Sequence, residues 1–206
     1  MRKLYSFLVF LVIANVGYSQ TIENYYKEAS ARSELKDYMG AIAILTKAIE
    51  LYPMSARAYT TRGIMKFELE DYRGAIQDFN KAVEVDPTNK DSFLMSQLGL
   101  GNAKSQLKDY HGAIQAFNVI IESYPQDYSA LSSRGSAKLE LEDYRGAIQD
   151  FNNAIELKPK SSWAYSKRAH AKYYLNDKEG ACLDWSKAGE LGDSTAYDMI
   201  KKFCNN

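Results

Sequence analysis

The hydrophobic and polar positions of this chain follow a pattern that returns about every 34 residues. The motif Asp-Tyr-x-Gly-Ala-Ile begins at Asp37, Asp71, Asp109 and Asp143, and a degenerate copy begins at Asp177. The longer segment ELEDYRGAIQDFN occurs without a mismatch at 68–80 and again at 140–152. Small residues and one apolar slot recur at the same places in every copy. The pattern predicts five copies of one structural unit.

Each unit carries start and stop signals for two helices. The residues expected to cap the first helices are Thr21, Ser55, Asn89, Asp127 and Ser161, and each motif aspartate precedes a second helix. Their side-chain oxygens accept hydrogen bonds from N–H groups that a helix start leaves without partners, and aspartate also favours its positive end. Prolines follow four of the second helices, at Pro53, Pro87, Pro125 and Pro159. The unit is therefore predicted to be a helix-turn-helix.

The residues of the second copy identify the family that this unit resembles. Positions 4, 8, 17, 20, 24, 27 and 32 are occupied by Tyr59, Gly63, Tyr72, Ala75, Phe79, Ala82 and Pro87, as is usual in a tetratricopeptide repeat. By this resemblance the copies are 22–55, 56–89, 94–127, 128–161 and 162–195, within a domain of residues 20–206. The resemblance implies an all-α, right-handed α-solenoid of about five helix-turn-helix repeats.

Two segments depart from this regular spacing. The second and third copies are separated by four extra residues, 90–93, which is nearly one helical turn. Since Asn89 keeps the spacing of the caps, we predict a first helix of copy three that is longer by a turn; a longer loop capped by Asp91 or Ser92 is the alternative. Residues 194–204 are expected to form a short C-terminal capping helix, because a solenoid end exposes apolar surface.

The first residues, 1–19, have the composition of a secretory signal peptide. Arg2 and Lys3 precede an almost wholly apolar stretch from Leu4 to Val16, and Gly17 and Ser19 are small residues before a cut ahead of Gln20. A membrane anchor is the alternative, but the apolar run is shorter than the roughly 20 residues that a spanning helix needs. We expect an exported protein of the periplasm, cell envelope or extracellular space, with no membrane span in the mature chain.

Composition narrows the possible functions further. The 26 basic and 26 acidic residues balance, so nothing in the charge predicts a nucleic-acid partner. With two histidines and two cysteines, a multi-histidine or four-thiolate metal centre is not expected. No triad, zinc-protease motif or phosphate-binding loop is present in the sequence. We therefore expect neither enzymatic activity nor a cofactor, and the chain lacks a heptad pattern that would demand a dimer, so a monomer is expected.

Charged residues recur together at two positions in three of the copies. The three expected pairs between first and second helices are Arg62 with Asp78, Arg134 with Asp150, and Arg168 with Asp184. Copies one and three lack both the arginine and the aspartate, with Glu28 and Ile44 or Leu100 and Ala116 in their places, which favours pairing within each repeat. The alternative, an anion site built from the three arginines, is less favoured.

The two cysteines lie close to the predicted cap. Cys182 occupies the recurrent apolar slot of the last copy, and Cys204 lies at the end of the capping helix. After export to an oxidising compartment these thiols could form a disulfide. Two separately buried thiols are the alternative.

By resemblance to the family, positions 2, 5, 9 and 12 of the first helices line a concave groove. The partner-binding residues expected from this placement are Tyr26, Arg57, Thr60, Ile64, Phe67, Met95, Leu98, Asn102, Trp163, His170 and Tyr173. Trp163 is the strongest single candidate, because tryptophan dominates interface energies. Packing against the preceding second helix is its alternative role.

These observations give a leading hypothesis and two rivals. The leading hypothesis is an exported, non-enzymatic scaffold that binds a peptide or protein segment in its groove. The rival is a structural subunit of a cell-envelope complex that uses its convex face or its ends. A weaker third possibility is a sugar or small-ligand site built on Trp163, Tyr173 and His170.

Overall fold

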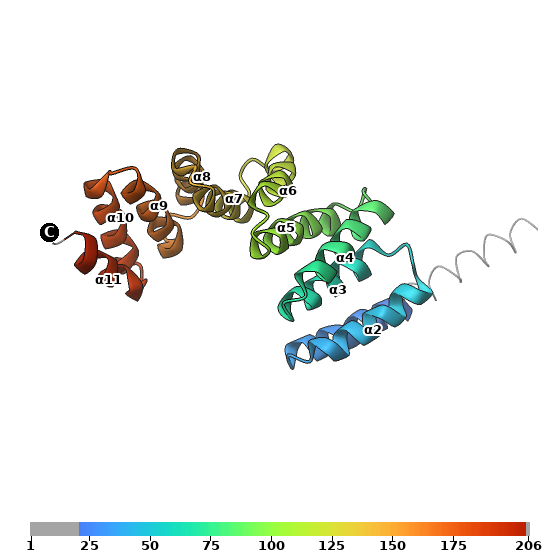
Figure 1. Ribbon diagram of the computed structural model, residues 1–206. Coiled ribbons are helices and arrows are strands. Elements are labelled where there is room, and N and C mark those ends of the chain that lie inside the picture. Colours follow the sequence, from blue (N-terminus) through green and yellow to red (C-terminus); the bar gives the residue numbers. More distant parts are fainter. Residues whose placement is uncertain (1–20, 205–206) are drawn as a thin grey trace, which may run out of the picture. The chain divides into compact units, whose positions relative to one another are not determined.

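The computed structural model of the protein describes residues 21–204, and every regular element in this range is an α-helix (Figure 1). The predicted signal peptide, residues 1–19, lies outside the described residues. Each predicted repeat contains two helices in succession, and a further helix follows the fifth repeat. The helices of the predicted helix-turn-helix units are thus all present.

The first hairpin consists of helical residues 21–34 and the second helix that follows them. The remaining helices, in chain order, are α2 (Tyr38–Leu51), α3 (Ala56–Glu68), α4 (Tyr72–Val85), α5 (Lys90–Gln106), α6 (Tyr110–Ser123), α7 (Tyr128–Glu140), α8 (Tyr144–Leu157), α9 (Ser162–Tyr174), α10 (Lys178–Glu190) and α11 (Ser194–Phe203). Helix α5 has 17 residues, whereas α3, α7 and α9 each have 13. The longer first helix predicted for copy three is therefore confirmed, and the Asn89 side chain accepts the Ser92 N–H at its start.

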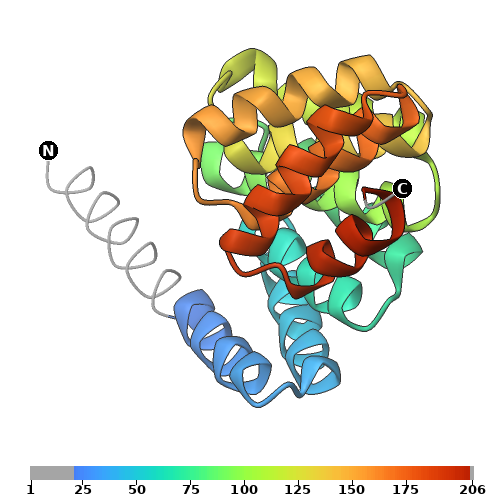
Figure 2. The ribbon, with the colours of Figure 1, turned by 90° about the vertical axis from the view of Figure 1, so that its left-hand side faces the viewer.

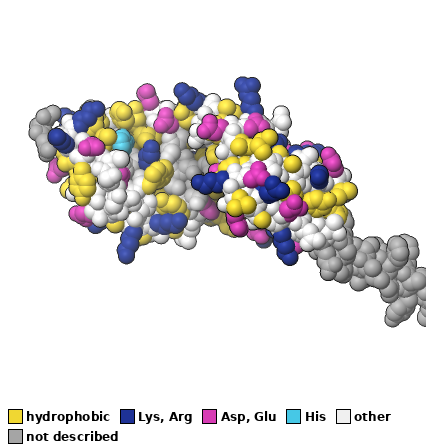
Figure 3. Space-filling view, turned by 90° about the horizontal axis from the view of Figure 1, so that it is seen from below, with side chains coloured by type: hydrophobic (Ala, Val, Ile, Leu, Met, Phe, Trp, Pro, Cys, Tyr) yellow, Lys and Arg dark blue, Asp and Glu magenta, His cyan; other side chains and the backbone are white. Residues whose placement is uncertain are grey.

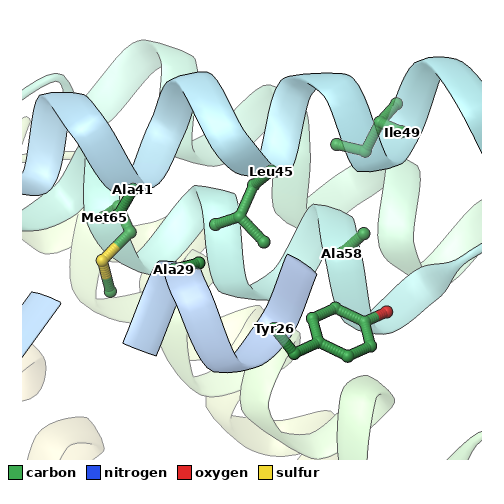
Figure 4. Packing of buried hydrophobic residues seen from close by; sticks show 7 residues of the cluster. All are labelled: Tyr26, Ala29, Ala41, Leu45, Ile49, Ala58 and Met65. Atoms are coloured by element: carbon green, nitrogen blue, oxygen red, sulfur yellow. The ribbon is translucent and has the colours of Figure 1, made fainter. Parts of the chain in front are cut away.

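The chain divides into two compact units, Met1–Gly99 and Leu100–Asn206, and the division falls within α5. In the first unit, residues 21–34 pack with α2 and α3 around one apolar core. Figure 4 shows its side chains, which are Tyr26, Ala29, Ala41, Leu45, Ile49, Ala58 and Met65. Small side chains at Ala29 and Ala41 let the paired helices lie close together, and Leu45 fills the space between them.

The second unit ends in an aromatic core formed by α9, α10 and α11, which lie side by side at the C-terminal end of the chain (Figures 1 and 2). Trp185 of α10 is fully buried there, with Ala169 and Ala196 against it. Tyr173 and Phe203 complete the cluster at ring-centroid distances of 5.9 and 5.8 Å from Trp185. Helix α11 covers apolar surface that the fifth repeat would otherwise expose, as a terminal cap must.

Aspartates cap the second helices in the same way in every repeat. Asp71, for example, accepts the Gly74 N–H at 2.9 Å, and Asp143 accepts the Gly146 N–H at 3.0 Å. A side chain at Gly74 would collide with the capping carboxylate, since an added Cβ would overlap its oxygens. The Asp-x-x-Gly part of the repeated motif is therefore a helix start in which cap and glycine require one another.

The first helices end in a turn that usually contains glycine, but no glycine stands at that position in this sequence. In the second repeat the Asp71 N–H bonds to the Lys66 carbonyl and the Glu70 N–H bonds to the Phe67 carbonyl, each at 2.9 Å. These two bonds are the Schellman arrangement, which requires a left-handed residue after the helix. That residue is never glycine here: the positive φ angles, between 58° and 63°, belong to Lys36, Glu70, Lys108, Glu142 and Asn176.

Candidate functional site

The predicted arginine–aspartate pairs are present as forked hydrogen bonds. In the fourth repeat, Nε and Nη2 of Arg134 donate to the two carboxylate oxygens of Asp150 at 2.9 and 2.6 Å. Asp150 is only 1% exposed, so its charge needs such a partner. The equivalent bonds join Arg62 to Asp78 and Arg168 to Asp184. The hydrogen bond to Asp78 raises the pKa of Arg62 above its ordinary value, although burial opposes the shift.

Each pair extends beyond the two residues that the sequence suggested. A lysine one turn further along the first helix adds a second cation, so that Lys138 Nζ lies 2.9 Å from Asp150. The third arginine nitrogen donates to the preceding repeat, where Arg134 Nη1 lies 2.7 Å from Asn118 Oδ1. The corresponding residues elsewhere are Lys66 and Lys172, and Thr46 and Asn152. These arginines thus hold carboxylates and neighbouring repeats, which disfavours the anion site considered above.

Comparison of the copies in the sequence reveals part of this hydrogen-bond network. Lysine occurs at the same position in all three paired copies, and a polar residue stands at the position that receives the third bond. However, Lys104 and Arg32 occupy the lysine position in copies that lack the pair, so the correlation is incomplete. The hydrogen bond between repeats, such as that from Arg134 to Asn118, becomes visible only in the structure.

The surface formed by the first helices, here called the first-helix face, contains a cavity in the first unit. Its volume is about 190 Å³, and Tyr26, Ser30, Arg57, Thr61 and Met65 contribute to its lining. The Tyr26 hydroxyl lies 2.6 Å from Ser55 Oγ, and the Arg57 guanidinium lies 4.0 Å from the centre of the Tyr26 ring. Arg57 also bonds to Glu23 at 3.2 Å. This cavity is small, and its tyrosine is held by the hydrogen bond to Ser55 and by the Arg57 guanidinium over its ring.

A larger cavity of about 330 Å³ lies on the first-helix face of the second unit, between the fourth and fifth repeats. Residues from the end of α7, the following turn and the start of α8 form one wall, and α9 forms the other. The lining residues are Leu139, Glu140, Glu142, Tyr144, Lys167, His170 and Tyr174. His170 is one of the groove residues expected from the sequence. Glu140, Glu142 and Tyr144 lie outside the groove positions 2, 5, 9 and 12, at the end of α7, in the turn and at the start of α8, so the groove pattern does not point to them.

Two predicted groove residues have a different role in the structure. Thr60 is 2% exposed and bonds to the Ala56 carbonyl and to Ser96 Oγ, so a partner cannot reach it. Tyr173 turns into the C-terminal core, with its ring 4.6 Å from that of Phe203. Both corrections have one reason: these side chains point toward a neighbouring helix. Tyr173 accordingly does not join Trp163 and His170 in a sugar or small-ligand site.

The remaining groove candidates differ in how far a partner could touch them. Met95 is 52% exposed, whereas Ile64, Phe67, Leu98 and Asn102 are half-buried. Ile64 packs against the core of the first unit, and Phe67 makes an edge contact with Tyr72 at 5.2 Å. Met95 therefore offers the most accessible apolar side chain of this group.

Trp163 combines both roles that its sequence position allowed. Its ring meets Phe151 of α8 edge-on, with centroids 5.9 Å apart, which is the packing alternative. It is nevertheless 43% exposed, and Lys167 lies over its ring at 5.9 Å. An aromatic ring anchored on one side and open on the other is suited to contact a partner.

The two cysteines are joined in the structure as a disulfide between α10 and the end of α11. The Cys182 and Cys204 Cα atoms are 5.9 Å apart, and the sequence separation is 22. The bond holds the capping helix over the Trp185 core.

Charge and metal chemistry add little to this picture. Basic and acidic side chains are interspersed over the face shown in Figure 3, without a broad field of one sign. Within residues 21–204, no three His, Cys, Asp or Glu side chains converge as metal ligands would. In the same range, no helix has the length and apolar character needed to cross a membrane.

Family models of the tetratricopeptide repeat match residues 23–55, 56–89 and 98–165, which together are more than half of the chain. The chain belongs to the tetratricopeptide-repeat family. The predicted fold class, an all-α solenoid of about five such repeats with a short C-terminal capping helix, is confirmed. None of the curated proteins compared with it matches.

Solved structures of other tetratricopeptide-repeat proteins share this fold at low sequence identity. A MamA fragment from Desulfovibrio magneticus RS-1 has a TM-score of 0.76 and 19% identity, covering 84% of this chain and 97% of its own. YrrB, described as a TPR protein with an unusual peptide-binding site, has a TM-score of 0.72 and 24% identity, covering 90% and 97%. At these identities the likeness establishes the fold.

Proposed function

We propose that this protein is an exported, non-enzymatic scaffold whose first-helix face binds a peptide or an extended protein segment. The observation that carries the proposal is the pair of cavities on that face, each formed at the junction of two neighbouring repeats. Clefts that recur between repeats suit a ligand that runs across several of them. The peptide-binding site named for YrrB lends support from a protein of the same fold.

Accessible apolar side chains on the first helices would supply much of the binding energy. Trp163 and Met95 are exposed enough for a partner to cover them. Both residues lie within helices, which fix the positions of their backbones. Aromatic anchors of this kind dominate interface energies, while surrounding contacts mainly exclude water. Since these contacts are apolar, we expect their part of the binding energy to depend only weakly on salt.

The test compares two variants matched in chemistry but placed on different helices. Trp163→Ala with Met95→Ala removes exposed apolar side chains from first helices. Leu51→Ala with Leu183→Ala removes two from second helices, where they are 58% and 66% exposed. Cross-linked capture from an envelope fraction should lose its partners with the first variant and keep them with the second. Identical partners for the wild type and the first variant would contradict the proposal.

A role in assembly has one observation in its favour. Leu35 and Met39, four residues apart at the turn of the first repeat, are 80% and 67% exposed, and neighbouring exposed apolar side chains can mark a contact surface. If this end joins a larger complex, changing both residues to serine should release the protein from that complex while peptide binding persists.

Export is tested separately. If the protein is exported and its signal peptide is removed, mass spectrometry of the mature protein should show that it begins at Gln20.

A further inference from the structure

The cavity between the fourth and fifth repeats is surrounded by hydrogen-bond acceptors. Glu140 is the last residue of α7, Glu142 lies in the turn, and both line the cavity. The Tyr110 hydroxyl donates to Glu140 at 3.3 Å, which leaves capacity on that carboxylate because it has two oxygens. No salt bridge of the described residues involves either glutamate. The wall of α7 therefore presents negative charge to the cavity.

His170, on the opposite wall, adds a further acceptor. Its Nδ1 lies 2.7 Å from the Ser166 carbonyl oxygen. A carbonyl can only accept, so Nδ1 carries the hydrogen, and in the neutral ring Nε2 is left with a lone pair. The ring lies nearly perpendicular to that of the buried Trp185, at a centroid distance of 5.4 Å, which fixes its position. Two carboxylates and an imidazole nitrogen together favour a ligand rich in donors.

Two stacked tyrosines give the cavity a flat aromatic side. The rings of Tyr144 and Tyr174 have centroids 5.1 Å apart and are inclined by only 16°. Tyr174 is 59% exposed, so its outer surface is open to a ligand. A planar cation stacks on such a ring and is attracted by its electron-rich face.

Lys167 also lines the cavity, and its positive charge opposes the binding of a cationic ligand. Its Nζ lies over the Trp163 ring, 5.9 Å from the ring centre, where the aromatic face stabilises the charge. Two carboxylates outweigh this one ammonium group. An anionic ligand would meet both glutamates, whereas a cation meets a net negative wall.

We propose that this cavity binds the side chain of an arginine in the partner peptide. Arginine fits better than lysine, because its planar guanidinium can bond a carboxylate through two N–H groups while it stacks on Tyr174. The inference rests on the proposed function, since it takes the ligand to be a peptide on the first-helix face. It adds the chemistry by which that peptide is selected.

The chain provides its own control for this site. The identical segment ELEDYRGAIQDFN places Glu68, Glu70 and Tyr72 in the second repeat as it places Glu140, Glu142 and Tyr144 in the fourth. The following repeat differs: the positions of His170 and Tyr174 are held by Asn102 and Gln106 in the third repeat. The variant Glu68→Gln with Glu70→Gln therefore removes the same charges from the same local structure, without altering the aromatic cavity.

The experiment measures binding of short, otherwise randomised peptides with a fixed central residue. Four sets carry arginine, lysine, citrulline or glutamate, and citrulline keeps the shape of arginine without its charge. Each set is tested with the wild-type protein, with Glu140→Gln plus Glu142→Gln, and with the control variant. The arginine set should bind about tenfold or more tightly than the citrulline set, and this preference should vanish only in the first variant. The Trp163 and Trp185 indole NMR signals should shift when the arginine set is added.

The other outcomes are equally informative. Equal binding of all four sets would overturn the arginine site while leaving peptide binding intact. A preference for glutamate, or equal preference for lysine and arginine, would also overturn it. If no set binds, the proposed function fails together with this inference. Equal loss in both glutamine variants would show that the effect is general charge and would again overturn the site.

Discussion

Arg168 Nη1 donates to Asn152 Oδ1 over 2.7 Å and so joins the fifth repeat to the fourth. The same guanidinium holds both oxygens of Asp184, so one side chain connects three helices. In repeat proteins the stability of the array depends on the interfaces between neighbours as well as on each repeat. A charge pair that looks internal to one repeat therefore also stabilises the contact between two.

The first prediction follows from this connection. Arg168→Leu leaves the buried Asp184 with Lys172 as its remaining cation and removes the bond to Asn152. We expect a loss of about 2–3 kcal/mol in the free energy of unfolding, somewhat below the roughly 3–5 kcal/mol for fully buried pairs, because Arg168 is partly exposed. Urea denaturation followed by circular dichroism measures it.

Copy three supplies the matched control, because Leu100 and Ala116 occupy the two charged positions there and both are buried. The double variant Arg168→Leu with Asp184→Ala should recover most of the lost stability, since no buried carboxylate remains uncompensated. Equal destabilisation of single and double variants would show that the loss comes from the contact with Asn152.

The second prediction concerns the disulfide between α10 and the end of α11. Cys204→Ser opens a loop with a sequence separation of 22, which costs about 3 kcal/mol in the chain-entropy description. The loss should appear at the C-terminal core, as faster hydrogen exchange in α11 and a changed emission of Trp185. A reductant should reproduce it in the wild type and do nothing to the variant. Two titratable thiols in the unreduced, unfolded protein would contradict the bond.

The features that could be predicted from the sequence are those that local rules determine once the repeat spacing is known. The caps Asp71 and Asp143, the longer α5 and the capping helix α11 all follow from local rules applied at a known spacing. Thr60 and Tyr173 were placed by a general groove pattern, but which way each side chain turns depends on neighbouring helices. Position in the repeat did not determine that direction.

The cavity next to His170 shows the same limit from the other side. Its walls come from two repeats. The acidic turn is the same in the second and fourth copies, whereas the first helix that follows differs at the positions of His170 and Tyr174. Glu140 and Glu142 look like any solvated acidic turn until Tyr174 is brought beside them. Chemistry created by juxtaposition of different copies cannot be found by comparing the copies one position at a time.

The third prediction uses the left-handed turn residues. Glu70 has a φ of 61°, which costs energy for a residue with a Cβ, while glycine adopts it freely. Glu70→Gly should therefore stabilise the protein by about 0.5–1 kcal/mol, after the added freedom of the unfolded chain is subtracted. Lys108→Gly should behave alike. Asn176→Gly should gain less, because asparagine tolerates this conformation, and an equal gain at Asn176 would contradict the explanation.

The last prediction concerns the pH dependence of the cap. Asp193 begins α11, and the hydrogen bond from the Thr195 hydroxyl, at 2.6 Å, lowers the pKa of this carboxyl below its ordinary value of 3.8, although burial opposes the shift. Because the folded pKa is the lower one, the charged carboxylate stabilises the fold fully above that value. The contribution disappears as the pH falls through the lowered pKa.

Asp193→Asn isolates this charge, since asparagine is an equally good cap but does not titrate. The wild type should unfold at a higher temperature than the variant near neutral pH, and the gap should close as the pH falls below about 4. All other carboxylates are common to both proteins, so their titration cancels in the difference. Asp198→Asn, on an exposed part of the same helix, controls for net charge. A gap that stays constant down to acidic pH would mean that the Asp193 side chain stabilises α11 through its shape and hydrogen bonds, without a contribution from its charge.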